Sequence, residues 1–329
     1  MKILDCSDIG VQQVSGSVVT IGNFDGVHRG HAELFNRLNE CGKRFGLPTV
    51  VVTFEPHPLT VLAPESAPPL ITTFSQKIEL IAQTGIDYLA VIQFTRAFSQ
   101  ISAETFVRKL LRDSLGMRHI IIGHDYGFGR GRAGNYETLD GMAVECGFSI
   151  EDLEPVGSDG VIYSSSLVRR QIADGDLSGA SATLGRYHTI AGPVVHGREI
   201  GQKIGFPTAN IATENELIPP DGVYAVFVTV GDQLVQGACN IGKNLTFDGA
   251  ARTIEVFLLD FSGQLYDCIL TVSFVQRLRD GMRFPSAEAL ITAINKDVAD
   301  TRTILANTDR DLIKPLTGRA IGVLCEKGC

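Results

Sequence analysis

The fold of the first half is decided by residues 18–45, which read VVTIGNFDGVHRGHAELFNRLNECGKRF. The run Val18–Ile21 is short, apolar and β-branched, which predicts a buried strand. Residues Ala32–Phe45 place their apolar side chains at helical spacing, which predicts an amphipathic helix. The loop Gly22–Gly30 joins the two, so the helix N-terminus follows a loop that contains glycines. Free N–H groups and a partial positive charge at such an N-terminus suit a phosphate group.

The same alternation of strand and helix continues through the first half. Further elements are predicted over Thr49–Phe54, Phe74–Thr84, Tyr88–Ile92, Ser102–Leu115 and His119–Ile122. This rhythm predicts right-handed βαβ units and a doubly wound parallel sheet. Ligands of such sheets bind at the carboxyl ends of the strands. We therefore expect the loops after Ile21, Phe54 and Ile122 to share one cleft.

The period of the pattern changes after Gly185. Strands are predicted over Ile190–Val195, Tyr224–Val230, Leu234–Asn240, Thr253–Leu259 and Leu265–Val275. Strands at this spacing predict an antiparallel β-barrel. A closing helix is expected over Ser286–Thr303, with Ser286 as its N-cap. Its apolar face is expected to hold Leu290, Ile291, Ile294 and Val298.

The pattern as a whole predicts an α/β chain of two domains. A Rossmann-like domain with a doubly wound parallel sheet is expected over residues 1–185. An antiparallel β-barrel domain with a closing helix is expected over residues 186–305. Residues 306–329 have a weak pattern and are expected to form a C-terminal tail.

Size and composition fit this organisation. The chain has 329 residues, 44% of them hydrophobic, and a net charge of −8, which argues against a nucleic-acid binder. Neither a signal peptide nor a membrane span of about 18 apolar residues is evident, so we expect a cytoplasmic protein without a membrane partner. Its seven cysteines are scattered, as expected of reduced thiols. Cys325 and Cys329 have metal-ligand spacing, but no further ligand is near them in sequence.

Two histidines stand at the start of the first predicted helix. His28 and His31 are three residues apart, which places them on the same side of one helical turn. Their N–H groups can donate to phosphoryl oxygens on which charge builds up. Two alternatives stay open: a surface turn with incidental histidines, and a two-histidine metal site that lacks a clear third ligand.

A second phosphate-binding element is indicated by the stretch from Ser164 to Arg169. Ser164, Ser165 and Ser166 come before a helical stretch, and Arg169 falls in its first turn. Arginine presents a fork of donors that matches a phosphate. Helix capping alone is the alternative for the serines.

The second half contains a candidate cation site. Thr208 and Asn210 are two residues apart, so on an extended segment their hydroxyl and amide oxygens point to one face. Glu255 lies within an apolar strand, where a carboxylate is costly unless it faces an opening. The alternatives are a β-turn at residues 207–210 and a glutamate on an exposed strand face.

Two glycine-rich strings are weaker signals. Gly129-x-Gly131-x-x-Gly134 matches a dinucleotide fingerprint, but it does not directly follow the strand that ends at Ile122, and no suitable acidic residue comes after it. Gly197–Lys203 approaches a Walker A motif but lacks its Gly-Lys-Ser/Thr ending.

The string GNFDGVHRGH at residues 22–31 closely resembles the HxGH signature of the nucleotidyltransferase superfamily. In this longer form it resembles the prokaryotic bifunctional riboflavin kinase/FAD synthetase family. The likeness runs to about Leu305 and includes four further strings: FEPHP at 54–58, GHDYGFG at 123–129, SSSLVR at 164–169 and PTAN at 207–210. It implies an HxGH nucleotidyltransferase-like domain and a riboflavin kinase barrel.

The resemblance also implies the chemistry and its residues. ATP and Mg²⁺ would serve the phosphorylation of riboflavin to FMN, and ATP would adenylylate FMN to FAD with release of pyrophosphate. The implied catalytic residues are His28, His31, Arg169 and Glu255. The implied ATP- and phosphate-binding residues are Gly22, Phe24, Asp25, Gly30, Ser164, Ser165, Ser166, Gly201, Lys203, Gly205, Thr208 and Asn210. The implied flavin-binding residues are Asn23, Phe54, Pro56, Pro58, Asp125 and Phe128, and Thr208 and Asn210 would hold the metal.

Three departures from the family pattern fall in or near the second half. Asn244-Leu245 stands where Arg-Pro is usual, Arg186-Tyr187-His188 where Arg-Pro-Tyr is usual, and Gly281 where Glu is common. Gly281 is interpreted as allowing a tighter turn. Two alternatives therefore stay open: an adenylyltransferase with a weakened or regulatory flavin-binding second half, and a non-enzymatic flavin carrier or sensor. A weak homo-oligomer is also open.

Overall fold

The computed structural model describes residues 1–6, 11–123, 126–197, 201, 204–243, 252–266, 268–314 and 316. Asp125, Lys203, Asn244, Leu245 and the cysteine pair Cys325/Cys329 lie outside these residues. The chain divides into two compact units, Met1–Pro69 with Lys77–Ser164 and Leu70–Gln76 with Ser165–Cys329. The boundary between residues 185 and 186 stays a prediction.

The first unit is built on a six-stranded parallel sheet, as predicted. Its strand order is β1-β4-β3-β2-β5-β6, and every neighbouring pair is parallel. The strands are β1 (Lys2–Asp5), β2 (Ser17–Ile21), β3 (Thr49–Glu55), β4 (Tyr88–Gln93), β5 (Met117–Gly123) and β6 (Ser149–Leu153). The chain leaves β2 toward β3 and returns to its other side at β5, so the switch point of the sheet lies at β2.

Helices cover both faces of this sheet. Their bounds are α1 (Arg29–Phe45), α2 (Pro58–Leu62), α3 (Phe74–Ala82), α4 (Ala103–Thr105), the π-helical η3 (Phe106–Ser114) and α5 (Tyr136–Cys146). One apolar cluster joins alternate residues of the strands to η3 and α5. The buried side chains of α1, which include Leu34, Phe35 and Leu38, are not part of that cluster and contact the opposite face. Successive side chains of each strand point to opposite faces of the sheet, and helices cover both faces. This explains why these strands are apolar throughout.

The second unit contains a closed antiparallel barrel, again as predicted. Its strand order is β10-β13-β12-β11-β14-β9. The strands are β9 (His188–Val195), β10 (Ala209–Ile211), β11 (Gly222–Val230), β12 (Gln233–Lys243), β13 (Arg252–Leu258) and β14 (Ile269–Arg279). The unit also holds α6 (Ser165–Ala173), α7 (Leu177–Leu184) and α9 (Ala287–Ala306).

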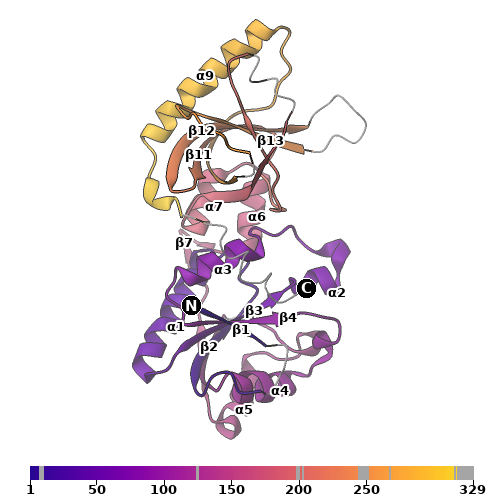
Figure 1. Ribbon diagram of the computed structural model, residues 1–329. Coiled ribbons are helices and arrows are strands. Elements are labelled where there is room, and N and C mark those ends of the chain that lie inside the picture. Colours follow the sequence, from indigo (N-terminus) through magenta and orange to yellow (C-terminus); the bar gives the residue numbers. More distant parts are fainter. Residues whose placement is uncertain are drawn as a thin grey trace. The chain divides into compact units, whose positions relative to one another are not determined.

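The closing helix α9 lies along the outside of the barrel (Figure 1). It begins after Ser286, whose hydroxyl accepts a hydrogen bond from the Ala289 N–H at 3.3 Å, as predicted. Its buried residues are Asp297, Thr301 and Leu305, so its inner face is less apolar than the sequence indicated. Leu305 packs on Ala225 and Phe227 of β11, which is why that strand is buried on both faces.

Several elements were not predicted, and three of them show why. β6 is half-exposed and carries Glu151 and Asp152, so it lacks the apolar run of a central strand. Helix α5 contains Gly141 and is only weakly amphipathic. Strand β10 has three residues, too few to show a period.

The barrel contains a buried histidine that links its stability to pH. His188 is 3% exposed, and its Nε2 lies 3.0 Å from the carbonyl oxygen of Leu217. Burial lowers the pKa of His188 to about 4. The unfolded chain therefore binds a proton at this residue between about pH 6.5 and pH 4, whereas the folded chain does not.

We expect the free energy of unfolding to fall as the pH drops from about 6.5 to 4, by an amount on the order of 3 kcal/mol from this residue. Denaturant titrations of the wild-type chain and of His188→Gln across this range test it. The variant should lose less stability with falling pH, because the remaining titrating groups are the same. Equal pH slopes in the two proteins would contradict the expectation.

Candidate active sites

The loop after β2 has a folded-back backbone that buries its own side chains. Phe24, Gly26 and Val27 all have positive φ, at 51°, 78° and 38°. Phe24 is only 2% exposed, and its ring packs against Phe35 of α1 at 4.9 Å and edge-on against His31 at 5.2 Å. The loop is thus fixed by the helix that follows it.

The two histidines of this loop lie together. The rings of His28 and His31 stack with their centroids 3.6 Å apart and their planes at 23°. His28 is the residue before the first turn of α1, so both rings lie at the helix N-terminus. A Cβ atom on Gly30 would lie 3.1 Å from the His28 ring, which explains the glycine between them. The glycine at position 22 is explained in the same way, because a Cβ atom there would lie 2.7 Å from the Phe24 ring.

The stretch before α6 comes close to this loop within the first unit. Arg29 lies over the Tyr163 ring at 5.5 Å and its guanidinium is 3.5 Å from the Tyr163 hydroxyl. Ser164 follows Tyr163 directly and belongs to the same unit. Ser165, Ser166 and Arg169 begin α6 in the second unit, and their predicted role at the first site stays a prediction.

The predicted flavin side of the first site lies at the end of β3. Phe54 is 7% exposed and contacts Phe94 at 5.7 Å. A row of aromatic contacts leads from Phe54 through Phe98 and Phe106 to Phe128, which is 5% exposed. These rings build the core, so a flavin would reach only their exposed edges. Pro56, by contrast, is exposed, and Pro58 begins α2 and is half-buried.

A lysine that the sequence did not single out joins these two loops. Lys77 on α3 is 7% exposed, and its Nζ lies 3.4 Å from the carbonyl oxygens of both Asn23 and Phe54. The Thr53 hydroxyl also donates to the Asn23 carbonyl, at 3.3 Å. No sequence signal marks Lys77, because a lysine on an amphipathic helix is ordinarily on the exposed face.

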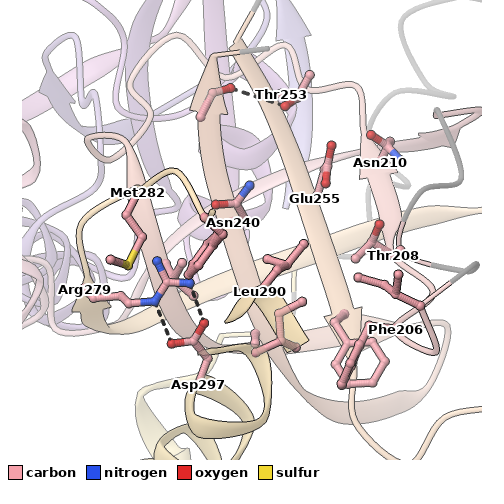
Figure 2. A pocket seen from close by; sticks show the side chains of 18 residues that line it. Phe206, Thr208, Asn210, Asn240, Thr253, Glu255, Arg279, Met282, Leu290 and Asp297 are labelled. Carbon is pink, nitrogen blue, oxygen red and sulfur yellow. Dashed lines mark hydrogen bonds and ion pairs between the residues drawn. The ribbon is translucent and has the colours of Figure 1, made fainter. Parts of the chain in front are cut away.

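The second unit has a pocket of about 350 Å³ on the outer face of the barrel, closed on one side by α9 (Figure 2). Four predicted site residues line it: Gly201, Thr208, Asn210 and Glu255. The other lining residues, none of them predicted as site residues, are Ile204, Phe206, Val223, Ala238, Asn240, Gly242, Thr253, Phe257, Arg279, Met282, Phe284, Leu290, Ile294 and Asp297.

Strand pairing places three polar side chains of this pocket in one row. In the barrel register Glu255 of β13 pairs with Asn210 on one side and with Asn240 on the other. Residues paired across strands point to the same face. Glu255 is half-buried between the buried Ile254 and Val256, so it faces the pocket as its burial cost requires. Figure 2 shows Thr208, Asn210 and Glu255 on the same side of the pocket.

The glycines near this row allow a close approach of the backbone. A Cβ atom on Gly201 would meet the carbonyl oxygen of Phe206, whose own N–H donates to the Gly201 carbonyl at 2.8 Å. Gly205 has φ of +89°, which favours glycine. The interpretation of Gly281 was wrong: it is not in the left-handed region, and a Cβ there would meet nothing within 4 Å. Its neighbourhood has room for a larger side chain.

The other side of the pocket is held by a bidentate ion pair. Arg279 donates to both carboxylate oxygens of Asp297, at 2.9 and 2.7 Å. Asp297 is 5% exposed, and the Arg279 guanidinium also lies 5.5 Å from the Phe284 ring centre. The pair fixes α9 to the end of β14. It was missed because an aspartate inside a helix pattern is usually taken as exposed.

Comparisons with known proteins assign the chain to a family. Residues 11–167 match the family model for FAD synthetase, and residues 184–305 match that for riboflavin kinase. A bifunctional riboflavin kinase/FMN adenylyltransferase from Pseudomonas fluorescens is 41% identical over 292 residues, which are 88% of this chain and 94% of that protein. The chain belongs to the bifunctional riboflavin kinase/FMN adenylyltransferase family.

The chain is similar to a second curated protein of this name and to a solved structure. The protein of that name from Escherichia coli (strain K12) is 38% identical over 89% of this chain and 94% of its own length. A crystal structure described as a macrolide-efflux protein from Streptococcus pneumoniae has a TM-score of 0.83 and 30% identity, covering 94% of this chain and all of that one. As a member of this family the chain is a transferase. No helix among the described residues is long and apolar enough to cross a membrane.

A further cluster of polar side chains lies within the first unit. Ligand-type atoms of Cys41, His119 and Glu151 lie within 4.8 Å of one another. Arg37 donates to both Glu151 carboxylate oxygens, at 2.5 and 3.0 Å, and Arg44 lies 3.5 Å from the Cys41 sulfur. A cation here would face two guanidinium groups. The cluster is therefore a half-buried ion-pair network that links α1 to β6.

The Arg279–Asp297 pair gives a stability test. Arg279→Met should destabilise the chain by about 2–4 kcal/mol, because it leaves the Asp297 carboxylate buried without its main partner. Arg279→Met combined with Asp297→Leu should recover most of that loss. Denaturant unfolding of both variants and the wild type measures the difference. A single variant as stable as the wild type would show that the ion pair does not compensate the buried carboxylate.

Proposed function

We propose that the chain phosphorylates riboflavin to FMN in the pocket of its second unit and adenylylates FMN to FAD at the His28–His31 loop of its first unit. ATP is the co-substrate of both reactions. The observation that carries this proposal is the row of Asn210, Glu255 and Asn240 in a pocket of about 350 Å³. It supplies a carboxylate and amide groups in an apolar cavity large enough for part of a flavin.

The oxygen atoms near this row fit Mg²⁺. Ala209 is buried toward the barrel interior, so Thr208 and Asn210 on either side of it point outward together. A hydroxyl and an amide carbonyl are hard oxygen donors, which Mg²⁺ prefers along with phosphate oxygens. When bound there, the ion would neutralise charge on the ATP phosphates. Thr208 is exposed, which leaves room for the nucleotide beside it.

In the kinase reaction the riboflavin 5′-hydroxyl oxygen forms a bond to the γ-phosphorus of ATP. The bond from that phosphorus to the β-bridging oxygen breaks, and ADP leaves. Glu255 accepts the hydroxyl proton, a step worth roughly 10²–10⁴-fold in rate. Glu255 pairs with Asn210 on one neighbouring strand and with Asn240 on the other. Its carboxylate therefore lies beside Asn210, to which we assign the metal and the phosphates.

In the adenylylation reaction an FMN phosphate oxygen forms a bond to the α-phosphorus of ATP. The bond to the bridging oxygen breaks, and pyrophosphate leaves with its charge. The FMN phosphate is already ionised, so alignment and charge stabilisation suffice. His28 and His31 at the N-terminus of α1, with Ser164, Ser165, Ser166 and Arg169, supply that stabilisation in this proposal.

An adenylyltransferase with a weakened second half is the second candidate. The substitutions at Asn244-Leu245 and Gly281 favour it. To separate the readings, the purified chain is incubated with riboflavin, ATP and Mg²⁺, and the flavins are resolved by chromatography. FMN and FAD together support the bifunctional enzyme. FAD from supplied FMN alone supports the second candidate, and unchanged flavin contradicts both.

Glu255→Gln should lower the rate of FMN formation by about 10²–10⁴-fold, because an amide cannot accept the hydroxyl proton. Adenylylation of supplied FMN should continue at the wild-type rate. Steady-state rates of both reactions test this in one preparation. Equal losses in the two reactions would indicate a folding defect and contradict the assigned role.

His28→Ala combined with His31→Ala should lower FAD formation from FMN by at least about 10²–10³-fold, because donors to the charged phosphoryl groups are lost. FMN formation from riboflavin should persist in the same protein and serves as the control for folding. Wild-type FAD formation in the double variant would rule out this site.

A further inference from the structure

Lys77 occupies a place that a lysine seldom takes. Its side chain is 9% exposed, whereas lysines are almost never buried unless they are paired. The ammonium group lies 3.4 Å from two backbone carbonyl oxygens, those of Asn23 and Phe54, and 3.9 Å from a carboxylate oxygen of Glu55. All of these groups belong to the first unit.

The two carbonyls come from two loops of the proposed site: the nucleotide-side loop after β2, in which Asn23 is also an implied flavin contact, and the flavin-side loop after β3. Asn23 lies in the loop after β2, which leads to His28 and His31 at the start of α1. Phe54 lies at the end of β3, just before the exposed Pro56 on the predicted flavin side. Strands β2 and β3 are parallel neighbours, so these loops leave the same edge of the sheet. The ammonium group therefore links the nucleotide-side loop to the flavin-side loop.

Two nearby carboxylates favour the charged form of Lys77. Burial lowers the pKa of Lys77, and the carboxylates of Glu55 and Asp25 oppose that change. Glu55 ends β3, and Asp25 follows Asn23 in the loop after β2. An ammonium group has up to three N–H donors, enough for both carbonyls and the carboxylate.

We propose that Lys77 is a positioning residue for FMN adenylylation, whose ammonium group sets the separation of the nucleotide-side and flavin-side loops by binding the Asn23 and Phe54 carbonyls. This inference rests on the proposed adenylyltransferase function of the first unit. Lys77 contacts the backbone carbonyls of the two loops and is assigned no contact with the substrate, so its effect on the reaction is indirect. A shift of about 1 Å between reacting groups can cost roughly 10²-fold in rate.

Lys77→Met tests the role of the charge at similar side-chain volume. We expect kcat/KM for FMN adenylylation to fall by about 10–100-fold, with a raised KM for FMN, because the two loops lose their common donor. Riboflavin phosphorylation should stay within about twofold of wild type. The variant should unfold at a somewhat lower temperature than wild type, because the Asn23 and Phe54 carbonyl oxygens lose a donor. Lys109→Met, a change of an exposed lysine that pairs with Asp113 at 3.3 Å, is the matched control and should leave both reactions unchanged.

A pH profile distinguishes positioning by charge from packing. In the wild type, adenylylation should decline as the pH rises toward the lowered pKa of Lys77, below the ordinary lysine value of about 10.4. Lys77→Arg keeps its charge over this range, so its activity should not decline with rising pH. It should also retain more activity than Lys77→Met. Riboflavin phosphorylation by the same proteins gives the reference profile.

The outcomes separate the two proposals. Absence of FAD from the wild-type chain supplied with FMN, ATP and Mg²⁺ would overturn the proposed function and this inference together. Wild-type kcat/KM in Lys77→Met would overturn this inference alone. Equal losses of both reactions would assign Lys77 a purely structural role, which also overturns it. Selective loss of adenylylation with the expected pH profiles supports it.

Discussion

A charge buried away from water must be compensated by its neighbours, and this requirement organises both units. In the first unit, Lys77 draws together two backbone carbonyls and Glu55 from the ends of adjacent strands. In the second, Arg279 holds both oxygens of Asp297 and so attaches α9 to the barrel. The Lys77 contacts span 54 and 23 residues of sequence, and the Arg279–Asp297 pair spans 18. The surfaces beside them are those to which we assign the two reactions.

Much of the fold could be predicted because the sequence carries its signals locally. The β-branched run before Gly22 and the amphipathic run after it predict β2 and α1 from spacing alone. The apolar run at residues 253–259, with Glu255 within it, predicts β13. Ser286 predicts the start of α9, because capping is a contact within one turn. The elements that were missed, such as β10 and β6, are too short or too polar to show a period.

The site was predictable where a motif carried it and not where tertiary contacts did. Thr208, Asn210 and Glu255 were named from the sequence, and all three line one pocket. Asn240 was not, because its place beside Glu255 depends on the register of β12 and β13. Lys77 and Asp297 were missed for a related reason. A charged residue on a helix is exposed by default, and only packing against other segments shows otherwise.

The barrel register has a further consequence for how this chain tolerates change. Asn210, Glu255 and Asn240 keep their relation through backbone hydrogen bonds of three antiparallel strands, which do not depend on the identity of loop residues. Insertions or exchanges in the connecting loops would therefore alter how substrates enter and leave, while the carboxylate and its amide neighbours keep their spacing. Changes in these loops would thus alter substrate entry and product release without moving the groups to which we assign the chemical step.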